Sequence, residues 1–377
     1  MSKNWKVLIL YASYGEGHRQ VSRVLEKHFH KKGIESVMVT DLFAEAHPWI
    51  NAFTRYLYVK SYTFLPSLYG WSYYSTQNMH NDTLLSRLFH SFGIRKLREI
   101  IQREQPDVVI NTFPMQVMPE FRKKAGCPIP TVTVLTDFAL HNRWLHPEID
   151  QFYVPTEEMK MQMIRKGIYT GQIQVSGIPL REGFECPDLH TTLQHYQEYG
   201  LDPSKKIVLV MASAYGRSML KKIGHACLAN GDLQMILLCG KNQSLQKELE
   251  TEFSRHSMIR VFGYVDAIPQ LMKMSSCLVT KAGGITLTEA LAINLPIIIF
   301  RPVPGQEAEN ARYLTKKGAA ITIQRADELP AVVTRLLDDA NRLSEMRRAV
   351  QYIHKSNAAE TIVDDIIDRM RQKVVQY

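Results

Sequence analysis

The fold is decided by VLILYASYGEGHRQ (residues 7–20), in which a run of apolar residues ends in two glycines, a glutamate and a histidine. The apolar run is typical of a strand that is covered on both faces. Gly15 and Gly17 allow positive φ and a close approach of the backbone, so the segment predicts a strand, a tight turn and a helix. Such a helix begins with unpaired N–H groups that attract an anion or a polarised oxygen. His18 adds a side chain that can take a proton at neutral pH, although a capping or solvated histidine is the simpler interpretation.

Short apolar, β-branched runs alternate with helical patterns along the rest of the 377 residues. Because strand–helix alternation favours a parallel, doubly wound sheet, and each half holds six candidate strands, the sequence predicts an α/β protein with two such sheets. The candidate strands are 6–13, 36–42, 107–113, 130–138, 151–156 and 173–179, then 207–214, 234–240, 259–264, 276–284, 295–300 and 319–323. Helices are expected at 16–32, 157–167, 241–254, 285–293 and 327–339.

A chain of this length is expected to form two domains of roughly 150–200 residues. We place an N-terminal domain at 1–180, a linker rich in proline and glycine at 181–203, and a C-terminal domain at 204–355. The last segment, 356–377, has one apolar stripe at helical spacing. It is expected to be a helix that packs back on the N-terminal domain.

Composition excludes several classes of protein. Five scattered cysteines without a CxxC pair argue against a zinc site or a disulfide framework and favour reduced thiols in the cytosol. The first residues lack the pattern of a signal peptide, and no stretch approaches the about 18 apolar residues of a membrane span. The chain is therefore expected to be soluble or to sit on a membrane. A net charge of +9 favours an anionic partner, but no basic–aromatic module indicates nucleic acid.

One stretch, residues 49–75, interrupts the alternation with six Tyr, two Trp and two Phe among interspersed Lys and Arg. Aromatic rings with polar tips suit the interface between membrane and water. The alternative is a buried helical insertion whose tyrosine hydroxyls find partners inside the protein. The composition leaves both interpretations open.

A second glycine turn lies in TKAGGITLTEALAINLPIII (280–299). Gly283 and Gly284 put bare N–H groups at a helix start, which suits a diphosphate. Glu289 follows on the first turns of that helix, where a carboxylate can accept hydrogen bonds from both hydroxyls of a ribose. The next loop and helix, RPVPGQEAENARYL (301–314), are expected to turn polar side chains toward the same place, namely Gln306, Glu307 and Asn310. An ordinary strand–helix unit with a capping box is the plainer alternative.

These motifs together resemble the glycosyltransferases that include the processive diacylglycerol glucosyltransferases, the monogalactosyldiacylglycerol synthases and the peptidoglycan N-acetylglucosaminyltransferase. The resemblance covers nearly the whole chain. It implies the GT-B architecture, in which two Rossmann-like domains face each other across a cleft. The matching stretches are KVLILYASYGEGH, DLFAEAHP, PDVVINTFP, TDFALHNRW, VSGIPLREGFE, LLCGKN, TKAGGITLTEA and PGQEAENA.

For the donor, the resemblance implies that the second domain binds a UDP-sugar. The implied contacts are Glu289 with the ribose, Gln306 and Glu307 with the sugar, Gly283, Gly284 and Thr286 with the diphosphate, and the loop around Gly263 and Tyr264 with uracil. Asn310 belongs to the same motif.

For the acceptor, the resemblance places a lipid on the first domain. His18 matches the histidine of the first glycine-rich loop, whose glycines are Gly15 and Gly17. Asp137 and His141 match the TDxxxH segment. The plant enzymes carry Asp where this chain has Ser13, so no base role passes to that position, and His18 and Asp137 stay as candidate bases.

The implied reaction is an inverting transfer of glucose from UDP-glucose to diacylglycerol, repeated to give mono- and diglucosyldiacylglycerol, the membrane glycolipids that anchor lipoteichoic acid. No DxD motif ends a strand, so no tightly bound metal or other cofactor is expected. The resemblance implies a peripheral enzyme on the cytoplasmic face of the cell membrane, drawn to its anionic surface. UDP-galactose or UDP-N-acetylglucosamine with another lipid-linked acceptor is the alternative.

A different class, an NAD-dependent dehydrogenase, would use GEGHRQ as the dinucleotide turn and Asp41 as the ribose-binding acid. Gln20 stands where that motif needs its third glycine, which argues against this interpretation.

Overall fold

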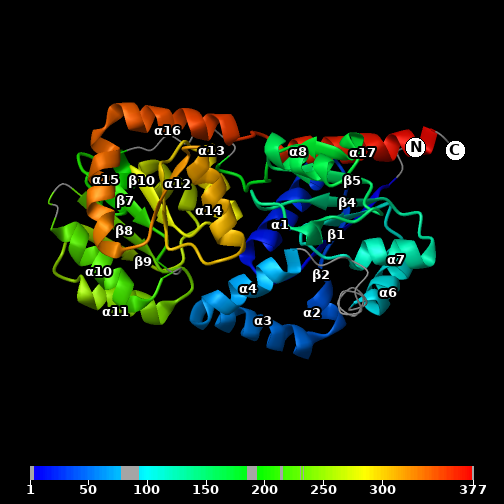
Figure 1. Ribbon diagram of the computed structural model, residues 1–377, viewed down its shortest axis with the longest axis horizontal. Helices are drawn as coiled ribbons and strands as arrows, with labels where there is room; N and C mark the ends of the chain where they lie inside the picture. The colour runs from blue at the N-terminus through cyan, green and yellow to red at the C-terminus, as the bar shows by residue number, and fades with distance from the viewer. Residues whose placement is uncertain are drawn as a thin grey trace. The chain divides into compact units, whose positions relative to one another are not determined.

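The computed structural model (Figure 1) describes residues 4–77, 93–184, 193–212, 215–229, 231 and 233–375. The chain forms two compact units. Unit 1 comprises Met1–Arg181, Pro304–Gln306 and Lys355–Tyr377, and unit 2 comprises Glu182–Val303 and Glu307–His354. The expected linker, 181–203, falls partly outside the described residues, and a short helix, α9 (Leu193–Glu198), occupies part of the rest.

Unit 1 contains a six-stranded sheet in the order β2-β1-β3-β4-β5-β6, in which every pair of neighbours is parallel. Its central strands are apolar and fully buried because helices cover both faces, which confirms the sequence-based prediction. The strands are β1 (Lys6–Tyr11), β2 (Ser36–Asp41), β3 (Val108–Asn111), β4 (Thr131–Val134), β5 (Gln151–Val154) and β6 (Ile173–Val175).

The helices of unit 1 connect these strands or extend from them. They are α1 (Glu16–Lys31), α2 (Leu42–Ala46), α3 (Pro48–Phe64), α4 (Pro66–Gln77), α6 (Ile94–Glu104), α7 (Val117–Ala125), α8 (Glu157–Arg165) and α17 (Ala358–Val375), with the short 3-10 helices η1 (Asn142–Trp144) and η2 (Thr170–Gln172).

The last helix of the chain, α17, packs beside α1 within unit 1 (Figure 1). Lys32 joins the two helices through ion pairs with Glu360 and Asp364 at 3.2 and 2.8 Å. On the sheet side, the Tyr153 hydroxyl donates to an Asp365 carboxylate oxygen at 2.6 Å. The apolar stripe of α17 is buried, so hydrophobic burial supplements these polar contacts.

The aromatic stretch 49–75 forms α3 and α4, and several of its large apolar side chains face solvent. Trp49 is 90% exposed and Trp71 is 68% exposed, and Phe53, Leu65 and Leu68 are also exposed. For these residues, the interpretation as a buried insertion is wrong. The side chains of Tyr58, Tyr62 and Phe64 lie outside the described residues.

Unit 2 contains the second six-stranded parallel sheet, in the order β12-β11-β10-β7-β8-β9. The strands are β7 (Lys206–Val210), β8 (Leu233–Leu238), β9 (Ile259–Phe262), β10 (Cys277–Thr280), β11 (Ile297–Phe300) and β12 (Ala320–Ile323). The helices are α10 (Arg217–Leu228), α11 (Gln243–Glu252), α12 (Ile268–Met274), α13 (Gly284–Ala292), α14 (Gln306–Lys316), α15 (Leu329–Asp338) and α16 (Ala340–Ile353), with the 3-10 helix η4 (Ala326–Glu328).

Each sheet has a point where the strand order reverses. In unit 1 the chain runs from β1 outward to β2 and then returns to β3 on the other side of β1. In unit 2 it runs from β7 through β8 and β9 and then returns to β10 on the other side of β7. Ligands of open α/β sheets bind in the crevice at the carboxyl ends of the strands beside such a reversal. The loops after β1, β3, β7 and β10 are therefore where sites are expected.

Candidate active site

The turn between β1 and α1 forms as expected, but its glycines do not use positive φ. Gly15 is the residue before the helix and has an extended backbone, with φ −173° and ψ 149°, and Gly17 already belongs to α1. Neither glycine uses the positive φ that glycine allows, because Gly15 precedes the helix in an extended conformation and Gly17 lies within it. A Cβ at Gly15 would meet no atom within 4 Å. The space beside this turn is thus open.

His18 lies in the first turn of α1, beside the carboxyl end of β3. Its Nδ1 is 2.7 Å from the backbone carbonyl oxygen of Thr112 and 3.2 Å from the Thr136 hydroxyl. Because a carbonyl oxygen only accepts, we assign the ring proton to Nδ1, which leaves the Nε2 lone pair for another partner. Ser22 fixes this turn further, since its hydroxyl donates to the His18 carbonyl oxygen and contacts the Thr112 hydroxyl.

The surroundings of His18 favour its neutral form. Burial lowers the pKa of the imidazole, while the Asp137 carboxylate and the Thr112 carbonyl oppose that shift. The rings of Phe113 and Trp144 lie 4.9 and 6.4 Å from the imidazole, centroid to centroid. A neutral imidazole with a free Nε2 and a buried carboxylate nearby has the composition of a general base.

His141 lies in the same segment as Asp137 but uses both of its ring nitrogens within unit 1. Nδ1 accepts from the backbone N–H of Arg143 at 3.1 Å, so Nε2 carries the proton and donates to the Tyr73 carbonyl oxygen at 3.2 Å. Burial lowers the pKa of His141 to about 4, opposed by the Tyr73 carbonyl and assisted by the Arg143 charge. The imidazole therefore ties η1 to α4 and keeps no nitrogen for an acceptor.

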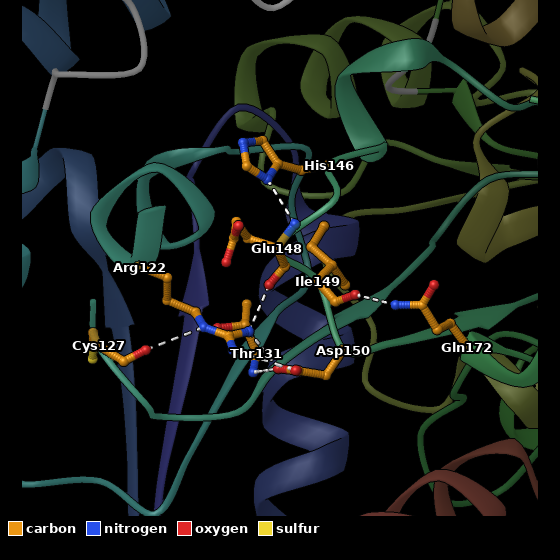
Figure 2. Close-up of polar contacts among 8 residues, drawn as sticks. All are labelled: Arg122, Cys127, Thr131, His146, Glu148, Ile149, Asp150 and Gln172. Atoms are coloured by element: carbon orange, nitrogen blue, oxygen red, sulfur yellow. Dashed lines mark hydrogen bonds and ion pairs between the residues drawn. The ribbon is translucent and has the colours of Figure 1, made fainter. Parts of the chain in front are cut away.

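A cluster of polar contacts fixes the stretch from His146 to Asp150, which follows the TDxxxH segment (Figure 2). The Arg122 guanidinium donates to the Glu148 carbonyl oxygen at 2.6 Å and pairs with the Asp150 carboxylate, which also accepts from the backbone N–H of Thr131 at 2.7 Å. His146 accepts from the Glu148 N–H at 3.1 Å. These contacts fasten α7 and β4 to the chain that follows Trp144. They are structural, since each partner belongs to the protein.

Asp41, the acid on which the dehydrogenase interpretation depends, is occupied by the backbone. One carboxylate oxygen accepts from the N–H of Ser13 at 3.0 Å, and the other accepts from the N–H of Ala44 at 3.0 Å. Because the residue is also buried, it is not placed to bind a ribose. Sequence and structure thus agree in disfavouring a dinucleotide site here.

In unit 2, the turn between β10 and α13 presents the start of a helix that no side chain caps. Gly283 precedes α13 with φ −71° and ψ 129°, and Gly284 is its first residue. A Cβ at Gly283 would meet no atom within 4 Å, so the approach to the first turn is open. Thr286 lies in that first turn and is partly buried, and Glu289 follows on the helix with 3% of its surface exposed.

The segment after β11 packs its polar residues onto this turn. α14 begins at Gln306, and the next residue, Glu307, accepts from the backbone N–H of Val303 at 3.2 Å. The Asn310 side chain is fully buried, and its amide donates to the Ala282 carbonyl oxygen at 3.0 Å. Asn310 therefore braces the glycine turn, whereas the sequence suggested that it would face the sugar.

Gly263 and Tyr264 follow β9 on the same sheet. A Cβ at Gly263 would lie 2.3 Å from the Gln246 side-chain oxygen, so glycine allows a close approach to α11. Tyr264 is exposed, with the Lys241 ammonium 5.8 Å from the centre of its ring. A flat, exposed ring of this kind can stack on a base.

Two residues at these strand ends were not singled out from sequence. Lys281 directly follows β10, and Tyr215 follows β7. Burial lowers the pKa of Lys281, and the nearby Glu307 carboxylate opposes that shift. The position of Lys281 beside Gly283 could have identified it, whereas nothing local marks Tyr215. A cavity of about 920 Å³ also lies in unit 2, along α10 and α11, but none of the predicted donor-binding residues lines it.

Comparison with known proteins agrees with this arrangement. The chain is 42% identical over 373 residues to the processive diacylglycerol beta-glucosyltransferase of Bacillus thuringiensis (strain Al Hakam), covering 98% of this chain and 95% of that protein. The protein of the same name from Bacillus cereus (strain G9842) is 43% identical over 372 residues, covering 97% and 94%. The chain belongs to the processive diacylglycerol β-glucosyltransferase family. Residues 18–180 also match the monogalactosyldiacylglycerol (MGDG) synthase family, and residues 207–366 match the glycosyltransferase family 28 C-terminal domain.

Solved structures share the fold of this chain, although their sequence identity to it is low. MurG of Acinetobacter baumannii has a TM-score of 0.61 at 16% identity, covering 97% of this chain and 99% of that one. UDP-GlcNAc 2-epimerase of Neisseria meningitidis, solved with UDP-GlcNAc, has a TM-score of 0.63 at 15% identity, covering 96% and 100%. These similarities show that the chain has the GT-B fold.

In the described part of the chain, His, Cys, Asp and Glu side chains form no group of three or more that would hold a metal ion. No described helix has both the length and the apolar character needed to cross a bilayer.

Proposed function

We propose that the protein is an inverting glucosyltransferase that moves glucose from UDP-glucose to diacylglycerol. It then adds a further glucose to its own product, giving mono- and diglucosyldiacylglycerol. The observation that carries this proposal is the 42% identity over almost the whole chain to proteins of that name. Nε2 of His18 lies at the strand-order reversal of unit 1 and has no hydrogen-bond partner among the described residues, so it is proposed as the base that the reaction needs.

In the proposed reaction, Nε2 of His18 takes the proton of the acceptor hydroxyl as its oxygen attacks the anomeric carbon. The bond from that carbon to UDP breaks as the new bond forms on the opposite face, so the anomeric centre is inverted. The buried Asp137 carboxylate stabilises the imidazolium that results. Positioned general-base catalysis of this kind is worth about 10²–10⁴ in rate.

The leaving UDP takes up negative charge, and the N–H groups at the start of α13 are proposed to receive it. Gly283 and Gly284 let a diphosphate approach, and the helix dipole favours the anion. Glu289 binds the ribose hydroxyls, Gln306 and Glu307 hold the sugar, and the Tyr264 ring covers the uracil. The protein is proposed to act without a metal ion, so excess chelator should leave the rate unchanged.

The acceptor lies in a bilayer, so the enzyme must reach one. The exposed Trp49, Phe53 and Trp71 on α3 and α4 are proposed to enter the interface, as a peripheral contact on the cytoplasmic face of the membrane. The net charge of +9 adds attraction to an anionic surface. Binding to vesicles should then rise with anionic lipid and fall with salt.

Chromatography of lipid products tests the proposal. The protein is incubated with diacylglycerol vesicles and, in separate arms, UDP-glucose, UDP-galactose or UDP-N-acetylglucosamine. Mono- and diglucosyldiacylglycerol formed from UDP-glucose alone are the expected products. Galactolipid as the main product would replace the proposed donor with UDP-galactose, and the absence of any glycolipid would refute the activity.

A further inference from the structure

The carboxyl ends of β7 and β10, where the strand order of unit 2 reverses, carry one tyrosine that has no assigned role. These strands lie side by side in the sheet (Figure 1). Tyr215 follows β7, and its backbone N–H donates to the Ala212 carbonyl oxygen at 2.9 Å, which places Tyr215 close to the end of that strand. The Tyr215 ring packs on Phe300, the last residue of β11, with 5.1 Å between ring centroids. The ring is thus held against the carboxyl end of β11.

The Tyr215 hydroxyl is enclosed by protein but has no hydrogen-bond partner among the described residues. A buried hydroxyl without a partner is costly, so such groups are commonly completed by a water or a ligand. Burial, and after it the Glu307 carboxylate, raises the pKa of Tyr215 well above its ordinary value. The hydroxyl therefore stays protonated and is available as a donor.

Two charged side chains, Glu307 and Lys281, limit which chemical group can hydrogen-bond to the Tyr215 hydroxyl. The Glu307 carboxylate lies close enough to act on both Tyr215 and Lys281. Because a carboxylate only accepts and a protonated phenol is a good donor, the group that fits both must accept one hydrogen bond and donate another. An alcohol does so. The Lys281 ammonium offsets the charge of Glu307, which favours a neutral group over an anion at this position.

We propose that Tyr215 is a specificity residue of the donor site, and that its hydroxyl donates to one hydroxyl of the donor hexose, which in turn donates to Glu307. This inference rests on the proposed function, because it takes a UDP-hexose as the ligand of unit 2. It adds a residue outside the AGGxTxxEA and PGQExxN motifs to the groups that recognise the sugar. A site that hydrogen-bonds a substrate hydroxyl discriminates strongly against the analogue that lacks it, since the partner is then left unpaired.

Calorimetry without acceptor tests this contact independently of lipid products. UDP, UDP-glucose and the four UDP-glucose analogues deoxygenated at C2, C3, C4 or C6 are titrated into the wild type and Tyr215→Phe. Loss of the hydroxyl should weaken UDP-glucose about tenfold and leave UDP within about twofold. One deoxy analogue should bind both proteins equally, and it identifies the hydroxyl that Tyr215 contacts.

Tyr352→Phe is the control, because Tyr352 lies on α16 with 70% of its surface exposed, and its ring faces the Lys317 ammonium at 5.5 Å rather than a strand end. It should leave all affinities unchanged. Equal affinity of the wild type and Tyr215→Phe for UDP-glucose, or an equal weakening of UDP itself, would overturn the proposal. A lower melting temperature of Tyr215→Phe would also overturn it, because it would reveal a partner for the hydroxyl inside the protein. Failure of the glucosyltransferase proposal appears separately, in the lipid chromatography.

Discussion

Acidification should lower the free energy of unfolding of unit 1 through His141, whose imidazole joins η1 to α4. In the folded protein, its two nitrogens are engaged by the Arg143 N–H and the Tyr73 carbonyl, and a second proton on the ring would break the first of these bonds. Burial keeps the pKa at about 4, whereas the unfolded chain takes up the proton near the ordinary value of 6.5. The unfolded state therefore binds more protons between these two values.

Because the folded pKa is lowered, the contribution of the neutral imidazole is fully present above pH 6.5 and is lost as the pH falls toward 4. The gap between the two pKa values corresponds to about 3 kcal/mol in the free energy of unfolding. About 2 kcal/mol of that amount should be lost by pH 5. Burial also lowers the pKa values of His18, His146 and His354, so the wild type loses more than this in total.

A single variant isolates the contribution of His141 to this loss of unfolding free energy. His141→Asn keeps an acceptor for the Arg143 N–H, since asparagine caps helices well, but it does not titrate. All four tryptophans lie in unit 1, so tryptophan fluorescence during urea unfolding follows that unit alone. Between pH 7 and pH 5, the variant should lose about 2 kcal/mol less than the wild type. An identical loss in both proteins would refute the assignment of a buried, neutral His141.

Three further predictions concern the proposed reaction. His18→Ala should lower kcat at least 100-fold without changing the melting temperature by more than a few degrees; turnover within tenfold of the wild type would remove His18 as the base. Glu289→Gln should weaken UDP binding about tenfold in calorimetry, because a neutral amide accepts hydrogen bonds from the ribose less well than a carboxylate; an unchanged affinity would place the ribose elsewhere. The double variant Trp49→Ala/Trp71→Ala should reduce partition onto anionic vesicles at least tenfold, with calorimetric UDP affinity as the control, and unchanged partition would exclude α3 and α4 as the membrane contact.

The architecture was predictable because its signal is repeated many times. Each of the twelve strands is a short apolar run between helical patterns, and continuous apolar runs of this length are typical of strands buried on both faces. The prediction did not depend on any single boundary, and the five helices expected at 16–32, 157–167, 241–254, 285–293 and 327–339 begin and end within about two residues of those limits. The order of the strands was not readable from periodicity alone. The sequence analysis therefore predicted two parallel sheets but not the order of strands within them, which only the structure gives.

The site was predictable in its location but less so in its details. Glycines at Gly15 and Gly283 marked the two turns correctly, although neither uses positive φ. The reason is that both stand just before a helix in ordinary backbone conformations, where a missing side chain leaves room. Tyr215 could not be found from sequence, because Phe300 and Glu307 are about 90 positions away in the chain, and only the fold brings the ring onto Phe300 and within the electrostatic influence of Glu307.

The sequence motifs contain residues that bind the protein backbone as well as residues that keep a polar atom for a ligand. The hydrogen bonds in the structure distinguish the two kinds. His141 and Asn310 stand within motifs that suggest contact with ligands, yet His141 Nε2 and the Asn310 side-chain nitrogen donate to the Tyr73 and Ala282 carbonyls. His18 binds the Thr112 carbonyl through one nitrogen only, so it both shapes its turn and keeps a reactive atom. A side chain whose donors and acceptors are all satisfied by the backbone can act on a ligand only through the loop that it holds. Substitutions at His141 should therefore affect stability and ligand affinity together, whereas those at His18 should lower the rate far more than the stability.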